Sequence, residues 1–277
     1  FDTQHQGGTG TELTTYSNFK FSRVDDNDVN GSAKFGGKLY DDFATLAGLY
    51  PYNPDAKFSQ FGYIYETQAY LNPVQNFPAG GGYDPNACLS VANIDVKGGS
   101  SEFKLAVGMI GFTFGDQQDL QGHKVKSIVV RIDDVNTDKA LSGKVKISAS
   151  SGDVDFIPTY SDAASVTGVL PDGEDVSGKT YYLCVAPVSD CNLNVSFILD
   201  DNRYYIRSIP VSSIATKTNG EILKAYSYSI SNINLKYSDF TLSEITEINN
   251  VSDFETWYEK LKTTTMMGRV VLKDDIV

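Results

Sequence analysis

The sequence has 277 residues, a net charge of −12 and 41% hydrophobic residues, enough for about two ordinary domains with a sizeable core. Because nucleic-acid backbones and anionic membrane surfaces repel such an acidic chain, the charge argues against both as partners. The 24 glycines, 17 tyrosines and 15 phenylalanines suit pleated strands and tight turns, so the composition predicts an all-β fold.

The amino-terminal segment is polar and rich in glycine, which predicts a flexible arm over residues 1–12 and a first strand over residues 13–24. The turn that follows carries Asp26, Asp28 and Asn30 at the spacing of the first half of a calcium-binding loop. Such a loop needs a bidentate Glu at its twelfth position, which is Gly37 here. We therefore predict an acidic turn and no metal site.

An aromatic-rich segment occupies residues 39–79. Within it, the run from Phe61 to Leu71 predicts a strand with aromatic partners on a neighbouring strand. Tyrosine rings stack on sugars, so Tyr63, Tyr65 and Tyr70 are candidate glycan contacts. Packing in a β-sandwich core is the alternative explanation for the same side chains.

The stretch from Phe103 to Phe114 is the longest run with almost no charge, and neither of its faces is clearly polar. Such a pattern predicts a central strand that is covered on both sides and around which other strands assemble. The stretch is too short for a membrane-spanning helix, which needs about 20 apolar residues.

Short strands follow at the spacing typical of sandwiches. We predict them near residues 124–132, 145–149, 155–159, 166–170, 180–186, 193–199, 203–209 and 225–235. Asp200, Asp201 and Asn202 form the tight turn of a hairpin. We therefore predict one β-sandwich over residues 13–155 and a second over residues 156–240.

The pattern changes after residue 240. Ser252 and Glu255 form a capping box, and apolar residues then recur at helical spacing until Gly268. A strand begins at Val270. We expect residues 241–277 to hold a linker, an amphipathic helix and a strand that open a truncated third unit.

Residue types that carry catalysis are not grouped in a motif. His5 and His123 form neither a zinc-binding frame nor a Ser/His/Asp arrangement, and no phosphate-binding glycine loop is present. We predict no catalytic residue, no cofactor site and no metal site. Carboxylates from separate strands leave a glycosidase as a third hypothesis.

Three cysteines are present. Cys184 and Cys191 flank a predicted hairpin and are a candidate disulfide, which would leave Cys88 single. The alternative is that all three are small buried hydrophobic residues.

Several short segments come in a specific order. Tyr50-Pro51-Tyr52 is followed by Gln75, by Gly82-Tyr83-Asp84-Pro85 and then by a short strand with Val-Ala. A Leu-Ser-Gly-Lys-Val segment over 141–145 and a Tyr-Tyr-Leu-Cys-Val-Ala-Pro segment over 181–187 come later. Together, over residues 13–240, these segments resemble the fimbrillin-like bacterial surface proteins, which include Mfa-like and type V pilin-related members.

This resemblance implies two tandem transthyretin-like β-sandwich domains in a secreted, lipid-anchored protein of Gram-negative anaerobes. It implies assembly by insertion of an extended strand into a neighbouring subunit. In some members an Arg-specific protease removes a leading strand, and Arg23 is the candidate processing site. The tail after Ile245 resembles the beginning of a right-handed β-helix domain of bacterial surface proteins.

We therefore expect a cell-surface adhesion or fimbrial protein, at a tip or stalk, that uses β-strand edges and performs no catalysis. Its partners would be other fimbrial subunits or a host or bacterial surface ligand. We expect an extracellular location at the outer membrane or fimbrium, without direct membrane insertion and with a lipid anchor as an option in the full-length chain. The alternative is a carbohydrate-binding module of a surface polysaccharide-capture system, with a glycan as partner.

Overall fold

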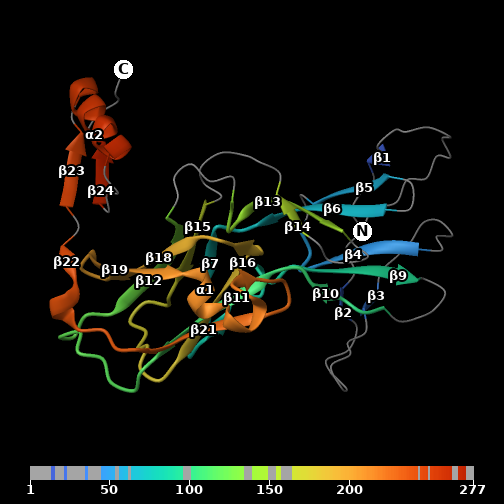
Figure 1. Ribbon diagram of the computed structural model, residues 1–277, viewed down its shortest axis with the longest axis horizontal. Coiled ribbons are helices and arrows are strands. Elements are labelled where there is room, and N and C mark those ends of the chain that lie inside the picture. Colours follow the sequence, from blue (N-terminus) through green and yellow to red (C-terminus); the bar gives the residue numbers. More distant parts are fainter. Residues whose placement is uncertain are drawn as a thin grey trace.

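The computed structural model describes residues 14–15, 22–23, 35–36, 45–53, 56–61, 64–95, 101–133, 139–148, 154–156, 164–242, 244–248, 250–263 and 268–272. Within these ranges most of the regular structure is β-strand, and the strands build two sandwiches (Figure 1). The all-β prediction is confirmed.

The smaller sandwich, on the right of Figure 1, pairs a five-stranded sheet of order β1-β5-β6-β13-β14 with a three-stranded sheet of order β10-β9-β4. Alternate side chains of β6 and β13 face its core, where Leu71 and Ile147 meet Val91 of β9. The strands of this sandwich are β1 (Thr14–Thr15), β4 (Thr45–Tyr50), β5 (Lys57–Phe61), β6 (Ile64–Leu71), β9 (Ser90–Asp95), β10 (Lys104–Leu105), β13 (Gly143–Ser148) and β14 (Val154–Phe156).

The larger sandwich pairs a four-stranded sheet of order β21-β11-β16-β8 with a six-stranded sheet of order β22-β19-β18-β12-β15-β7. Its core contains an aromatic cluster in which the Phe114 ring lies edge-on to Tyr181 and Phe197, with centroids 6.1 and 5.9 Å away. The strands of this sandwich are β7 (Val74–Asn76), β8 (Gly82–Tyr83), β11 (Gly108–Phe114), β12 (Val125–Ile132), β15 (Ser165–Val169), β16 (Thr180–Val185), β18 (Asn192–Leu199), β19 (Arg203–Pro210), β21 (Ser227–Ile233) and β22 (Thr241–Leu242).

Smaller elements join these sheets. The helix α1 (Val211–Ile214) packs against β19 and β21, and two 3-10 helices follow, η2 (Thr216–Thr218) and η3 (Tyr237–Asp239). Two short antiparallel ladders pair β2 (Ser22–Arg23) with β3 (Phe35–Gly36) and β17 (Val188–Ser189) with β20 (Glu221–Ile222).

The apolar stretch predicted as one central strand is two strands in different sheets. β10 belongs to the smaller sandwich, β11 belongs to the larger one, and the buried residues Ala106 and Val107 connect them. The prediction of a strand covered on both sides is confirmed for β11, whose residues are buried or half-buried throughout and which lies between β16 and β21.

The two sandwiches do not follow one another along the sequence. β12, which precedes the predicted boundary at residues 155/156, lies between β15 and β18, which follow it. The chain reaches the larger sandwich first at β7 and returns to the smaller one at β9 and again at β13. A division into residues 13–155 and 156–240 therefore does not describe the sheets, because alternation predicts where a strand is but not which sheet it joins.

The predicted hairpin after Leu199 is confirmed. β18 and β19 pair antiparallel from Asn192 opposite Pro210 to Ile198 opposite Tyr204. Asn202 has a φ of 66° in the turn, a conformation that Asn tolerates better than most residues, and its N–H donates to the Leu199 carbonyl.

The carboxy-terminal segment forms a helix and a strand, as predicted. α2 (Val251–Thr263) connects β23 (Glu244–Ile248) to β24 (Gly268–Leu272), and the two strands pair in parallel. The cap differs from the prediction, because the side chain of Asn250 rather than Ser252 accepts the Asp253 N–H, at 2.9 Å. Ser252 already lies inside the first helical turn.

Candidate functional site

The three tyrosines proposed as glycan contacts are described to different extents. Tyr63 lies outside the described residues, and of Tyr65 the structure gives only its strand position on β6, opposite Gln60. Tyr70, also on β6, is 51% exposed and lies opposite Lys144. The platform of three rings therefore stays a prediction, with Tyr70 available at the surface.

Arg23 lies in the two-residue strand β2, opposite Phe35 of β3. The acidic turn that follows it in the sequence lies outside the described residues. Cleavage after Arg23 stays a prediction.

All three cysteines are free, and the structure does not place Cys184 and Cys191 against the same core. The prediction assumed a hairpin, but β16 belongs to the four-stranded sheet and β18 to the six-stranded sheet. The Cys184 side chain is buried in the core of the smaller sandwich, whereas Cys191 packs against the core of the larger one. Cys88 is the cysteine that packs against the same core as Cys184.

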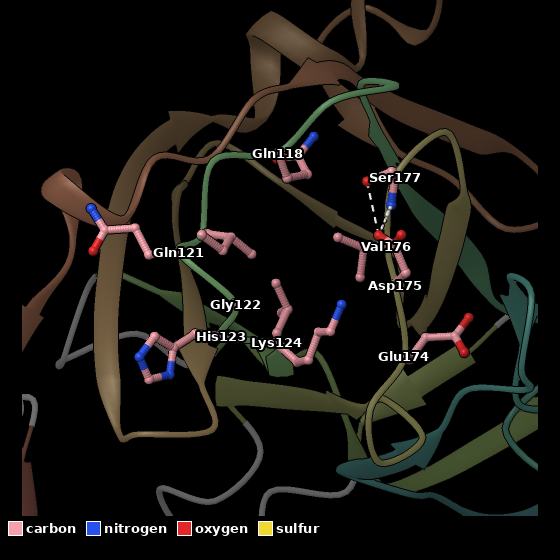
Figure 2. A pocket seen from close by; sticks show the side chains of 11 residues that line it. Gln118, Gln121, Gly122, His123, Lys124, Glu174, Asp175, Val176 and Ser177 are labelled. Carbon is pink, nitrogen blue, oxygen red and sulfur yellow. Dashed lines mark hydrogen bonds between the residues drawn. The ribbon is translucent and has the colours of Figure 1, made fainter.

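Loops at one end of the larger sandwich enclose a cavity of about 160 Å³ (Figure 2). Its lining comes from two segments, residues 118–125 and 174–177. The amide of Gln118 is already engaged, because its nitrogen donates to the carbonyls of Gly115 and Ile233 and its oxygen accepts the Leu235 N–H. The carboxylate of Asp175 accepts from both the N–H and the hydroxyl of Ser177.

Glu174, on the rim of the same cavity, is engaged more fully. Its Oε1 accepts from Lys179 Nζ, the Gly80 N–H and the Tyr181 hydroxyl, each at 2.8 Å. The bonds from Lys179 and Gly80 lower the pKa of Glu174 despite its partial burial, while burial and then the bond to Glu174 raise the pKa of Tyr181. Glu174 therefore stays ionised and Tyr181 stays protonated. This pair of groups is suited to connecting loops by hydrogen bonds and is poorly suited to transferring a proton.

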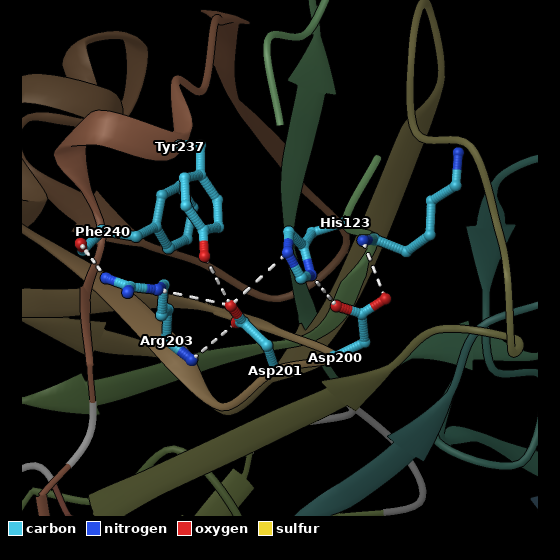
Figure 3. Close-up of polar contacts among 7 residues, drawn as sticks. His123, Asp200, Asp201, Arg203, Tyr237 and Phe240 are labelled. Carbon is cyan, nitrogen blue, oxygen red and sulfur yellow. Dashed lines mark hydrogen bonds and ion pairs between the residues drawn. The ribbon is translucent and has the colours of Figure 1, made fainter. Parts of the chain in front are cut away.

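A second polar cluster lies beside the cavity, around the turn between β18 and β19 (Figure 3). His123 Nδ1 lies 2.8 Å from Asp200 Oδ1, and its ring stacks on Tyr237 at 4.9 Å. Asp201 Oδ2 accepts from the Tyr237 hydroxyl at 2.9 Å and lies 3.3 Å from Arg203 Nε. The Arg203 guanidinium also covers the Tyr237 ring and reaches the carbonyl oxygen of Phe240.

His123, Asp200 and Asp201 could each offer a ligand atom to a metal ion, and those atoms lie within 4.8 Å of one another. The guanidinium of Arg203, in contact with Asp201, already neutralises one of the two carboxylates and would repel a cation. The arrangement instead ties the β18–β19 turn to η3 and to β22, which follows η3.

Outside these clusters, the larger sandwich presents an unpaired strand edge along β21. β21 is the last strand of its sheet and pairs in parallel with β11, and no other described strand pairs with its outer edge. The Met109 N–H donates to the Tyr226 carbonyl at 2.9 Å, so Tyr228 and Ile230 also direct their backbone groups toward β11. By the same alternation, Ser227, Ser229 and Ser231 direct their N–H and C=O groups outward.

The side chains of β21 form one buried face and one exposed face. Tyr228, Ile230 and Ile233 are buried in the core, and Ser227, Ser229 and Ser231 are exposed. A bulge at Asn232, with a φ of 57°, accounts for the step of three residues between Ile230 and Ile233. The predicted strand over residues 225–235 is confirmed, and alternation in the sequence puts Tyr226, Tyr228, Ile230 and Ile233 on one face. Of these four, Tyr226 is 52% exposed and the other three are buried. The sequence did not show that the strand is an edge, although three uncharged serines on one face were a usable signal.

Comparison with known proteins gives structural likenesses only. No family model and no curated protein sequence matches the chain. A solved structure of a candidate cell adhesion protein from Bacteroides ovatus is 13% identical, with a TM-score of 0.41 over 82% of this chain and 76% of that one. One from Bacteroides uniformis is 11% identical, with a TM-score of 0.37 over 70% of this chain and 87% of that one. Both TM-scores lie below 0.5, so we base no step of the functional argument on them.

In the part of the chain that the structure describes, no helix combines the length and the apolar character that crossing a bilayer requires.

Proposed function

We propose that the chain is a non-catalytic adhesion or fimbrial protein of the bacterial cell surface, and that it accepts an extended strand along the outer edge of β21. The observation that carries the proposal is the unpaired, uncharged edge of β21. The order of the fimbrillin-like segments supports the same class of protein. The polar clusters near the cavity support it as well, because most of their carboxylates and amides are engaged in bonds within the chain.

The physics of strand addition fits β21. Each outward residue offers one donor and one acceptor, so Ser227, Ser229 and Ser231 together offer six ladder groups to an added strand. Serine side chains are small and allow a second backbone to approach. The inward side chains Tyr228 and Ile230 hold the strand in the core, so the edge is rigid before any partner binds.

The test is to remove one outward donor without disturbing the ladder to β11. In Ser229→Pro the missing N–H is one that faces away from β11, and an edge strand tolerates proline at such a position. We expect sedimentation velocity to show that the wild-type chain and Ser229→Ala associate with a second copy, and that Ser229→Pro stays monomeric. Far-UV circular dichroism and thermal unfolding establish that all three fold alike. Equal association of folded Ser229→Pro and Ser229→Ala would reject the β21 edge as the binding site.

A carbohydrate-binding module is the second candidate, and exposed aromatic rings favour it. Tyr50 and Phe103 are 48% and 38% exposed. Their ring centroids lie 6.5 Å apart. Tyr83 is 41% exposed. Tyr70 adds a further exposed ring on β6. Binding on a glycan array that disappears in Tyr50→Ala or Tyr70→Ala, but not in Ser229→Pro, would favour this function over strand addition.

A further inference from the structure

Two cysteines that are far apart in sequence lie together where the two sandwiches meet. Cys184 is in β16, fully buried against the core of the smaller sandwich, while its neighbours Leu183 and Val185 belong to the core of the larger one. Cys88 follows β8, which runs parallel to β16 with Tyr83 opposite Tyr182. The half-buried Cys88 side chain packs against the same core as Cys184.

Polar contacts hold both cysteines in place. The carboxylate of Asp84 accepts the N–H groups of Asn76 at 2.8 Å and Asn86 at 2.9 Å, which shapes the turn before Cys88. The side-chain amide of Gln75 donates to the Cys184 carbonyl at 2.7 Å and accepts the Cys184 N–H at 2.9 Å. The backbones on both sides of the cysteine pair are therefore fixed before any reaction takes place.

We propose that Cys88 and Cys184 form a reversible disulfide by exchange with a small external disulfide such as oxidised glutathione. The Cys88 thiol loses its proton, and its thiolate attacks one sulfur of the external disulfide. One small thiolate leaves and takes up a proton, and a mixed disulfide remains on Cys88.

Cys184 completes the reaction. Its sulfur attacks the Cys88 sulfur of the mixed disulfide and expels the second small thiolate, which takes the proton that Cys184 gives up. In the balance, two protein thiols are oxidised to one disulfide and one external disulfide is reduced to two thiols.

The surroundings of the two thiols explain why Cys88 attacks the external disulfide first and Cys184 reacts second. The S–H of Cys184 donates a hydrogen bond to Cys88, which lowers the pKa of Cys88, and the same bond together with burial raises the pKa of Cys184. Cys88 is also the more exposed of the two, so it is the thiolate that a reagent in solution meets first.

The disulfide would link the loop after β8 covalently to β16, which lies between the two cores. β16 contributes side chains to both cores, so a covalent link at Cys184 restrains the contact between the sandwiches as well as the loop. Because it closes a long stretch of chain, the disulfide lowers the entropy of the unfolded state and raises the thermal midpoint.

The experiment uses the whole chain in a glutathione redox buffer, followed by acid quenching, alkylation with iodoacetamide in denaturant and peptide mapping without reduction. We expect two of the three cysteines to escape alkylation and one peptide to join Cys88 to Cys184, lighter by two hydrogen atoms. Cys191→Ser should give the same joined peptide and Cys88→Ser should give none. The thermal midpoint should rise on oxidation in Cys191→Ser and stay unchanged in Cys88→Ser.

Alkylation of both Cys88 and Cys184 after the oxidising treatment would overturn the proposal. So would a joined peptide that contains Cys191. The peptide maps of the wild type and of Cys191→Ser are sufficient to show whether Cys88 and Cys184 are joined, even if Cys88→Ser does not fold.

Discussion

β21 and the part of β19 that extends beyond its short partner β22 both lie at a sheet margin of the larger sandwich, and α1 packs against each strand. Only β19 carries features that protect it against pairing. β22 covers β19 at Arg203 and Tyr204, and Pro210 ends the strand. Arg207 lies opposite the buried Val195, so a charge stands on the core-facing side of an edge. Natural sheets use these three devices to prevent edge-to-edge association.

β21 has none of these devices along Ser227 to Ser231, where its exposed side chains are serines. The bulge at Asn232 interrupts pairing only at the far end of the strand. Of these two margins, β19 carries protective features, whereas among the described residues nothing pairs with the outer side of β21. Protection against pairing is therefore set strand by strand in this sandwich, by the residues that each margin carries.

The largest expected effect comes from removing the side chain that anchors β21. Tyr228 is buried, and its hydroxyl accepts the Leu223 N–H at 2.8 Å and donates to the Glu221 carbonyl at 2.9 Å. Tyr228→Ala should lower the free energy of unfolding by about 3–5 kcal/mol, measured by urea denaturation. The exposed Tyr226 is the matched control, and Tyr226→Ala should cost about 0.5 kcal/mol or less. Similar losses in both variants would contradict a rigid, core-anchored edge.

A smaller effect is expected at the cluster that holds the covering segment over β19. Burial opposes ionisation of Asp201, but the Arg203 N–H, the Tyr237 hydroxyl and nearby positive charge lower its pKa below the ordinary value of 3.8. A lowered carboxyl pKa adds stability that is present above the unfolded pKa and is lost as the pH falls through the folded one.

Asp201→Asn should therefore lose about 1–2 kcal/mol at neutral pH, as expected when a hydrogen-bonded charge is removed. It should also lose less further stability than the wild type between about pH 5 and pH 2. Urea denaturation across this pH range measures both effects. Asp239 is an exposed carboxylate of η3, so the Asp239→Asn control should show the same dependence of stability on pH as the wild type.

If Asp201→Asn also shows the wild-type dependence, the cluster does not hold the segment that covers β19.

The smallest effect on stability is expected at Arg207, where the change should appear in association instead. Arg207→Val replaces the inward charge of β19 with an apolar side chain, so the free energy of unfolding should change by about 0.5 kcal/mol or less while self-association increases. Both valine variants are made in the Ser229→Pro background, so that β21 does not contribute to association.

The control is Arg131→Val, the same substitution at an exposed position of β12, which has a neighbouring strand on each side. This control should stay monomeric. If sedimentation shows no difference between the two valine variants, β19 is not protected by its charge.

Alternation in the sequence predicted most strands of the larger sandwich, because inward residues such as Ile128 and Val130 recur with the period of a pleated strand. It did not predict partners. β11 pairs in parallel with β21, more than a hundred residues later, and no local pattern encodes such a pairing. The same limit applies to the predicted disulfide, since Cys184 and Cys191 are close in sequence but pack against different cores.

The candidate site was predictable only in part. The alternation of Ser229 with Tyr228 and Ile230 gave the inward face of β21, but whether a strand is an edge depends on how many neighbours the whole fold supplies. Glu174 accepts hydrogen bonds from Lys179 and Tyr181 nearby and from Gly80, which is far away in the sequence. The spacing of residues in the sequence does not predict this contact with Gly80. Of the three tyrosines predicted as glycan contacts, Tyr70 is the one whose exposure the structure describes, and it is exposed.

The back-and-forth path of the chain between the two sandwiches has a mechanical consequence. β7 and β8, then β9 and β10, then β11 and β12 alternate between them, so no single cut of the chain releases one sandwich intact. Because each sandwich is assembled from separate stretches of the chain, we expect the two to unfold together rather than one after the other.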